Sequence, residues 1–305
     1  MNTTFGIIDI GSNTIRLNIY KIDNRDFRVI MSEKSAAGLV SYIQDGALSE
    51  EGIFKLESVL HEFKEILEVL HVKDYAVFAT ASLRNISNSA QVLEAIHERC
   101  GIPIDLLSGS QEGCMSFSGA LHGLAHEEGM YIDTGGGSTE VVLYAGGDIS
   151  FAASMPIGSL NLFNKYVGEI VPTKNEAEKI QKRVEKEMKA IAPDGQIFQV
   201  KNLAVTGGSM RAVREVLVSL KWIKSSDFEI EPSMLKKLVK YLLEDASRTI
   251  RLFLKVKPDR IHTLFTGLLI VDAIARLTGC KTVQVSVNGV REGYLVEKVI
   301  NTQDA

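Results

Sequence analysis

The chain has 305 residues, of which 45% are hydrophobic and 24% are charged, and its formal net charge is -4. This length favours two domains, and the composition is globular, which excludes disordered, collagen-like and fibrous chains. An acidic chain without a clustered basic face is not expected to bind nucleic acid. No stretch reaches the roughly 18 consecutive apolar residues of a membrane span, so no membrane partner is expected.

The N-terminal sequence MNTTFGIIDIGSNTIR has no basic segment before its apolar run, so it is not predicted to be a signal peptide. Cys100, Cys114 and Cys280 are widely spaced and form no CxxC motif. The six histidines are scattered along the chain, and we expect them to be structural or exposed. Reduced thiols and the missing signal sequence predict a cytoplasmic protein. The oligomeric state stays open, with a homodimer as the commonest default.

Predicted strands and helices alternate along the chain, which indicates an α/β protein. Up to residue 129 we expect strands at 5–10 and 15–22, a helix at 50–70 with Ser49 as its N-cap, a strand at 75–80, a helix at 88–100, a strand at 104–107 and a helix from 111. Beyond it we expect strands at 130–134, 140–145 and 149–154, a helix at 173–191, a strand at 203–206 leading into a helix, mostly helix from 232, and a strand at 282–286.

One loop pattern occurs twice. Asp9-Ile-Gly11-Ser12-Asn13-Thr14 and Asp133-Thr-Gly135-Gly136-Gly137-Ser138 both read D-x-G-x-x-[ST] between two predicted strands. Such a repeat predicts two similar α/β domains that face each other, with a ligand in the cleft between the two turns.

The glycine-rich turns favour phosphate binding. Gly135-Gly136-Gly137 lets backbone N–H groups approach an anion closely, and Ser12, Thr14 and Ser138 add hydroxyl donors. Thr206-Gly207-Gly208-Ser209 follows a strand and opens a helix, a position that also favours anions. Neither a Walker A motif nor a G-x-G-x-x-G motif after a strand is present, which disfavours P-loop and dinucleotide-binding folds.

Carboxylates flank these loops. Asp133 and Glu140 bracket the second turn, and the two ends of a hairpin return to one another, so both are predicted to bind Mg²⁺. Asp9 is the counterpart of Asp133 and is expected to hold a metal-bound water. Arg84 follows a strand at its carboxyl end, the usual ligand edge of an α/β sheet.

These residues lie in motifs that resemble a known family. IDIGSNTIRLNIY, ATASLRN, LLSGSQEG, YIDTGGGSTEVVL, AVTGGSMRAV and NGVREGYL are similar, in order and spacing, to the Ppx/GppA phosphatases, which are exopolyphosphatases and guanosine pentaphosphate phosphohydrolases. The resemblance spans Ile8 to Glu297. It implies two duplicated domains of the actin-like superfold, which is ribonuclease H-like and includes sugar kinases and heat-shock chaperones.

The resemblance also implies roles for individual residues. Glu112 matches the catalytic glutamate that orients or deprotonates the attacking water, and Arg84 matches an arginine that contacts phosphate. Asp133 and Glu140 match the metal-binding acids. The phosphate-loop positions are Ser12, Asn13, Gly136, Gly137, Ser138, Gly208 and Ser209.

The sequence departs from the family pattern in several places, including Thr134, which stands between Asp133 and Gly135. Gln111 stands where the family has the first of two glutamates, and Gly113 follows the second. Ala37-Gly38-Leu39 replaces an R-L-G motif, and Arg260-Ile261-His262 replaces R-A-D. The additional helical domains of longer members are also missing, so short polyphosphate chains are expected to be favoured.

We therefore expect an actin-like domain I at 1–117 with about 290–305, and an actin-like domain II at 118–289. The predicted reaction is hydrolysis of terminal phosphoanhydride bonds in polyphosphate or guanosine pentaphosphate (pppGpp), with Mg²⁺ or Mn²⁺. A non-catalytic (p)ppGpp-binding sensor and an ATP-dependent small-molecule kinase are the alternatives. The preference between the two substrates, the favoured chain length and the identity of the metal stay open.

Overall fold

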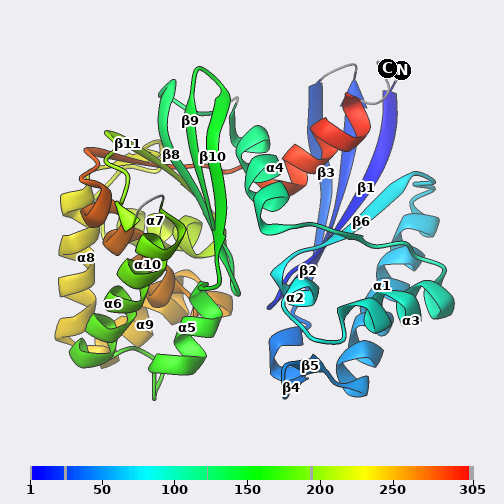
Figure 1. Cartoon of the computed structure of the whole chain (residues 1–305), viewed down its shortest axis with the longest axis horizontal. Coiled ribbons are helices and arrows are strands. Elements are labelled where there is room, and N and C mark those ends of the chain that lie inside the picture. Colours follow the sequence, from blue (N-terminus) through cyan, green and yellow to red (C-terminus); the bar gives the residue numbers. More distant parts are fainter. Residues whose placement is uncertain (1, 24–25, 122, 193–194, 302–305) are drawn as a thin grey trace. The chain divides into compact units, whose positions relative to one another are not determined.

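The computed structural model describes residues 2–23, 26–121, 123–192 and 195–301 (Figure 1). The chain divides into unit 1, Met1–Glu112 with Tyr294–Ala305, and unit 2, Gly113–Gly293. The sequence prediction set these limits at 1–117 with about 290–305, and at 118–289. The part of the expected C-terminal helix beyond residue 301 lies outside the described residues.

Unit 1 is built on a five-stranded sheet. Its strands are β1 (Asn2–Ile10), β2 (Ile15–Asp23), β3 (Asp26–Ser35), β6 (Tyr75–Ala79) and β7 (Asp105–Leu106), in the order β3-β2-β1-β6-β7. Its other elements are η1 (Leu39–Tyr42), the β4–β5 hairpin (Ile43–Gln44, Ala47–Leu48), α1 (Glu50–Val69), α2 (Ala81–Arg84), α3 (Ser89–Cys100) and the π-helical segment Val296–Ile300. Helix α4 (Gly109–Leu121) begins in unit 1.

Unit 2 contains a six-stranded sheet. Its strands are β8 (Glu128–Thr134), β9 (Thr139–Ala145), β10 (Asp148–Met155), β11 (Asn202–Thr206), β12 (Glu229–Ile230) and β13 (Thr282–Val285), in the order β10-β9-β8-β11-β13-β12. Its helices are α5 (Ser159–Tyr166), α6 (Lys174–Ile191), α7 (Gly208–Ser219), α8 (Pro232–Glu244), α9 (Ala246–Val256), η3 (Pro258–Arg260), α10 (Leu264–Thr278) and α11 (Val290–Leu295). Among the residues that the structure describes, no helix is both long and apolar enough to cross a membrane.

The two sheets share one topology. In each unit three consecutive strands pair antiparallel, and the first of them also pairs in parallel with a fourth strand, which pairs in parallel with a fifth. Unit 2 adds the short antiparallel strand β12. The two similar α/β domains expected from the duplicated loop are confirmed by this repeated strand order.

Sequence patterns located most of the long elements but missed one long strand and some short helices. Ser49 caps α1 as predicted, since its side chain accepts a hydrogen bond from the Gly52 N–H. Strand β3 was not predicted, because its residues are mostly exposed or half-buried and give no apolar alternation. The short helices α2 and α5 were also not predicted.

Opposite faces of the unit 2 sheet have separate cores. Met130, Ile132 and Val205 point into a large apolar cluster with α5 to α10, and Figure 1 shows these helices gathered on one side of the sheet. Tyr131 and Val142 point to the other face, where they pack against Phe117 and Ala120 of α4. This alternation follows from the two-residue period of strands, and it places α4 over a face that carries polar residues nearer the Gly-rich loop.

Helix α4 also packs closely against α11. A Cβ atom at Gly119 would overlap backbone atoms of Gly289 and Gly293, and one at Gly293 would overlap the carbonyl of Met115. The two backbones therefore approach at a distance that only glycine permits.

Replacing Gly119 by alanine should therefore destabilise the protein. Alanine in a helix is otherwise favoured over glycine by about 1 kcal/mol, whereas overpacking costs about 1–3 kcal/mol. We expect a net loss in the free energy of unfolding, measured by urea titration. Ser118→Ala in the same helix is the control and should change stability little. A more stable Gly119→Ala variant would contradict the close contact.

Candidate functional site

The two repeated loops have the same backbone geometry. In the first, the Gly11 N–H donates to the Thr14 carbonyl at 3.1 Å, and in the second the Gly135 N–H donates to the Ser138 carbonyl at 3.0 Å. Each loop joins an antiparallel pair, β1–β2 or β8–β9. The sequence repeat therefore corresponds to a repeated hairpin turn.

The loop in unit 1 is held by the segment after β3. The Gly38 N–H donates to the Asn13 carbonyl at 3.0 Å, and the Val40 N–H donates to the Ser12 carbonyl at 3.2 Å. Gly38 has a φ of 58°, a left-handed conformation that favours glycine. Ser12 and Asn13, which are predicted to contact phosphate, are half-buried. The hydrogen bonds to their carbonyls come from the segment around Ala37-Gly38-Leu39, which replaces the family's R-L-G motif.

The loop in unit 2 is held by the start of α5. The N–H groups of Ser159 and Leu160 donate to the carbonyls of Gly135 and Gly136, both at 2.9 Å, and the Asn161 side chain donates to the Gly137 carbonyl at 2.8 Å. These bonds fix the carbonyls of the loop on the α5 side. Ser138 is 2% exposed, so this end of the loop is buried.

A third loop lies beside the second one, because β8 and β11 are parallel neighbours with Thr206 opposite Asp133. Gly207 has a φ of 113°, and a Cβ there would overlap the Thr134 carbonyl. Ser209 is 1% exposed, and its hydroxyl donates to the Ser159 hydroxyl at 3.2 Å. A phosphate contact at Ser209 would therefore come from the backbone N–H at the start of α7.

The predicted metal-binding acids are direct cross-strand neighbours. Asp133 lies opposite Glu140 in the β8–β9 pair, and such residues point to the same face of a sheet. Glu140 also lies opposite Ser154 of β10, whose hydroxyl donates to Glu140 Oε1 at 2.9 Å. The structure therefore brings Asp133 and Glu140 together, as the hairpin argument predicted.

Asp9 has a different neighbour. It occupies the position in β1 that Asp133 occupies in β8, but the residue opposite it is Arg16. A carboxylate opposite a guanidinium has less need of a metal ion than one opposite a second carboxylate. The role of Asp9 in holding a metal-bound water stays a prediction.

Asp133 lies in an environment that disfavours its charge. Burial raises its pKa above the ordinary value of 3.8, and the charge of Glu292 acts in the same direction. A hydrogen bond from the Ser116 hydroxyl and the charges of Arg211 and Arg291 lower the pKa but do not cancel the effect. A desolvated carboxylate beside buried Glu140, which is 1% exposed, fits a divalent cation bound by oxygen ligands.

Helix α4 covers this pair with small residues. A Cβ at Gly113 would lie 3.3 Å from the Glu140 Cβ and from Val142, and Ser116 reaches Asp133 one turn later. Gly113 therefore leaves α4 room to pack against the acidic pair.

Glu112 and Arg84, the two predicted catalytic residues, are paired in unit 1. Arg84 Nη1 donates to Glu112 Oε2 at 2.7 Å and to the Leu107 carbonyl at 2.9 Å. The side chains are 10% exposed for Glu112 and 17% for Arg84. Charge-assisted bonds of this length are strong and directional, so Arg84 fixes the position of the Glu112 carboxylate.

Gln111 has a structural role at the start of α4. Its backbone N–H donates to the Ser108 hydroxyl at 3.2 Å, and its side-chain oxygen accepts from the Ser108 N–H at 2.9 Å. This reciprocal pair is a capping box, in which glutamine and glutamate are equivalent. The exchange of glutamate for Gln111 therefore preserves the cap that precedes Glu112.

Sequence reasoning missed three arginines of unit 2 that interact electrostatically. Burial lowers the pKa of Arg211 and of Arg260, and the positive charge of Arg291 adds to both effects. The guanidinium of Arg260 packs against Gly208, where a Cβ would collide with it. Mutually repelling cations beside Gly-rich loops favour a multiply charged anion. The sequence did offer one signal for these arginines, because Arg211 lies in the first turn of the helix that follows Gly207-Gly208.

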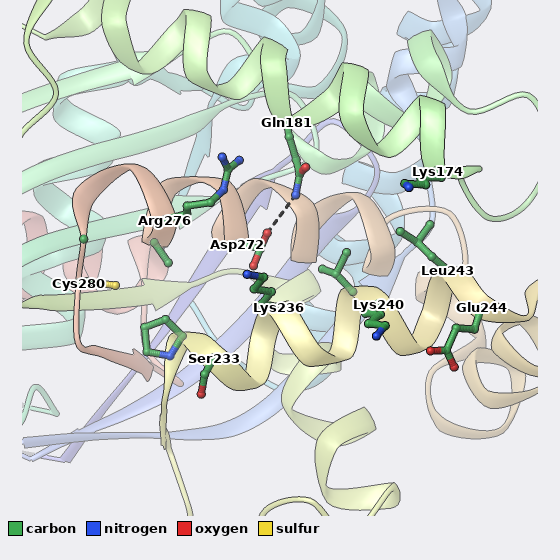
Figure 2. Close-up of a pocket in the computed structure, with 14 residues that line it drawn as sticks. Lys174, Gln181, Ser233, Lys236, Lys240, Leu243, Glu244, Asp272, Arg276 and Cys280 are labelled. Atoms are coloured by element: carbon green, nitrogen blue, oxygen red, sulfur yellow. Dashed lines mark hydrogen bonds between the residues drawn. The ribbon is translucent and has the colours of Figure 1, made fainter.

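A separate cavity of about 710 Å³ lies among α6, α8 and α10 (Figure 2). Gln181 Nε2 donates to Asp272 Oδ2 at 3.0 Å within it, and burial raises the pKa of Asp272. The lining contains none of the residues predicted to bind phosphate or metal. We therefore do not assign this cavity to the predicted reaction.

The raised pKa of Asp133 predicts a pH-dependent stability. The folded state holds the proton more tightly than the unfolded state, so the cost of burying the charge is absent below about pH 4 and grows as the pH rises. Without metal, Asp133→Asn should therefore raise the free energy of unfolding at pH 7, by roughly 1.4 kcal/mol per unit of pKa elevation. The gain should shrink toward pH 4.

Urea unfolding in the presence of a chelator, at a series of pH values, measures this difference. Asp148→Asn, at an exposed position of β10, is the matched control and should show no such trend. A gain from Asp133→Asn that is independent of pH would contradict the assignment of the effect to a buried charge.

Comparisons with known proteins agree with this fold. The crystal structure of the Ppx/GppA family member from Aquifex aeolicus is 24% identical, with a TM-score of 0.81 and coverage of 100% of both chains. An exopolyphosphatase from Cytophaga hutchinsonii is 21% identical, with a TM-score of 0.83 and coverage of 98% of each chain. The model of the Ppx/GppA phosphatase family matches residues 18–302. Because this match spans nearly the whole sequence, the chain belongs to the Ppx/GppA phosphatase family.

Proposed function

We propose that this protein is a metal-dependent hydrolase of terminal phosphoanhydride bonds. Its substrates would be inorganic polyphosphate, with short chains favoured, pppGpp, or both, and the product would be orthophosphate. The observation that carries the proposal is the cross-strand pair Asp133–Glu140 in a unit that also holds three electrostatically linked arginines and two Gly-rich loops. Paired acids and clustered cations together suit a metal–phosphate complex, and membership in a phosphatase family supports the same reaction class.

The loops and arginines would bind the phosphate oxygens. In phosphoryl transfer the protein mainly positions groups and stabilises charge. Gly136, Gly137 and Gly208 would supply backbone N–H donors, and Arg211 and Arg260 would offset the negative charge. The buried positions of both arginines strengthen this interaction, because solvent screens it less.

Asp133 and Glu140 would hold the metal ion, Mg²⁺ or Mn²⁺. When bound, such an ion neutralises charge on the terminal phosphates. Ser116 and Ser154 each donate a hydroxyl hydrogen bond to one of the two carboxylates. We expect these serines to keep the carboxylate oxygens oriented for ligation.

Glu112 would orient the attacking water and accept its proton. The water oxygen forms a bond to the terminal phosphorus while the bridging P–O bond breaks, and orthophosphate leaves the shortened chain. Arg84 would hold the Glu112 carboxylate and contact the phosphate as well, since a guanidinium carries five N–H donors.

Glu112→Gln tests this role. It keeps the size of the side chain and a hydrogen-bond acceptor for Arg84 but removes the base. Positioned general bases contribute about 10²–10⁴-fold, so we expect phosphate release with Mg²⁺ to fall by at least about 10²-fold. Colorimetric release of phosphate from short polyphosphate, long polyphosphate and pppGpp, with and without Mg²⁺, is the measurement.

Glu98→Gln, at an exposed position of α3, is the matched control and should retain full activity. Near-normal turnover of Glu112→Gln would reject Glu112 as the base. Tight binding of (p)ppGpp by the unaltered protein without any phosphate release would favour the non-catalytic sensor. Formation of ADP from ATP with a sugar or acetate would favour a kinase.

Chain length provides an independent test. A net charge of -4 gives no long-range attraction for a polyanion, so phosphates beyond the site should add little binding energy. We expect kcat/KM per chain to be as high for short polyphosphate or pppGpp as for long chains. Partial digestion of long polyphosphate should give a ladder of intermediate lengths on a gel. Full-length chains alongside orthophosphate alone would indicate processive action and contradict this expectation.

A further inference from the structure

Helices α1 and α3 of unit 1 bring together three side chains of different chemistry. Glu57 and His61 are one turn apart on α1, and Cys100 is the last residue of α3. One potential ligand atom from each residue, a carboxylate oxygen, an imidazole nitrogen and the thiol sulfur, lies within 4.8 Å of the other two. None of these residues belongs to the phosphate loops or to the acidic pair of unit 2.

The spacing of these atoms suits a zinc ion. Zinc–ligand distances of roughly 2.0–2.3 Å in a tetrahedral site place the ligand atoms roughly 3.3–3.8 Å apart. Glu57 Oε1 and His61 Nε2 are 3.9 Å apart. Small side-chain rotations would therefore suffice to close the three ligands around one ion.

The carboxylate of Glu57 is only partly satisfied without such an ion. Its Oε2 atom is buried and accepts no hydrogen bond, and the Arg99 guanidinium lies 3.6 Å from it. Arg99 is itself held over the Phe54 ring, 5.3 Å from its centroid. Arg99 thus faces Oε2 while Oε1 faces His61, an arrangement that orients Glu57 as a monodentate ligand.

Access and charge are also compatible with a metal. The His61 side chain is 49% exposed, which provides a route for an ion, whereas Cys100 is 5% exposed. Burial raises the pKa of the Cys100 thiol, and the charge of Glu57 raises it further, while Lys64 and Arg99 oppose this. A bound divalent cation would reverse the effect and deprotonate the thiol.

We propose that Glu57, His61 and Cys100 form a zinc site that joins α1 to α3, with water as the fourth ligand. Thiolate and imidazole ligands select zinc over Mg²⁺, which prefers oxygen ligands. The site is therefore chemically distinct from the one proposed for Asp133 and Glu140. Its sequence signal is weak because Cys100 comes from a different helix than the other two ligands.

Cobalt substitution tests the ligand set directly. Titration of the full-length, chelator-treated and reduced protein with Co²⁺ should give one equivalent of tetrahedral cobalt with a thiolate-to-cobalt charge-transfer band. The band should be lost in Cys100→Ser and retained in Cys280→Ser, a buried cysteine of unit 2 that serves as the control. No charge-transfer band in the unaltered protein, or an unchanged band in Cys100→Ser, would overturn the proposal.

Zinc affinity, measured by competition with a chromophoric chelator, provides the second readout. His61→Ala changes an exposed side chain and should leave the fold intact, as circular dichroism would verify. We expect it to weaken zinc binding by more than about 10-fold, and Arg99→Ala, which removes a positioning residue, to weaken it by about 10-fold. His97→Ala changes a different exposed histidine, which lies on α3, and should leave zinc binding unchanged. Equal affinity in His61→Ala and the unaltered protein would reject the site.

Discussion

Asp133 and Glu140 are directly opposite residues where β8 and β9 approach the Gly-rich loop. Two like charges in this position destabilise a sheet unless neighbouring groups compensate them. Ser116 and Ser154 donate hydrogen bonds to the pair from α4 and β10. Gly113 lets α4 pass close to Glu140. One serine of α4 and one of β10 thus each donate a hydrogen bond to this pair, and a glycine of α4 leaves room for it.

The two halves of the protein share a backbone design and differ in charge. Gly11–Thr14 and Gly135–Ser138 close with the same backbone hydrogen bond. The second strand of the hairpin decides the chemistry, since Arg16 faces Asp9 in unit 1 whereas Glu140 faces Asp133 in unit 2. The residue opposite the aspartate therefore distinguishes the two hairpins. In unit 1 it is basic, whereas in unit 2 it is a second acid, and two acids together suit a cation.

Few local sequence patterns reveal how the groups proposed to act on the substrate are positioned. Arg84 ends a four-residue helix, and its bond to Glu112 connects residues far apart in the sequence. The Ser108–Gln111 capping box explains a departure from the family motif through helix-end hydrogen bonding. In unit 2, Arg291 affects both Arg211 and Arg260, although the three come from different segments.

The sequence by itself determined the α/β class, most of the long helices and strands, the duplicated hairpin and the proximity of Asp133 to Glu140. These features follow from local periodicity, capping and the closure of a hairpin, all of which act over short distances along the chain. The sequence did not determine the exposed strand β3, the burial of Ser138 and Ser209, or the partner of Asp9. Nor did it reveal the arginine cluster or the grouping of Glu57, His61 and Cys100. Those features depend on which face of each strand is covered and on helices packed from distant segments, which only tertiary contacts decide.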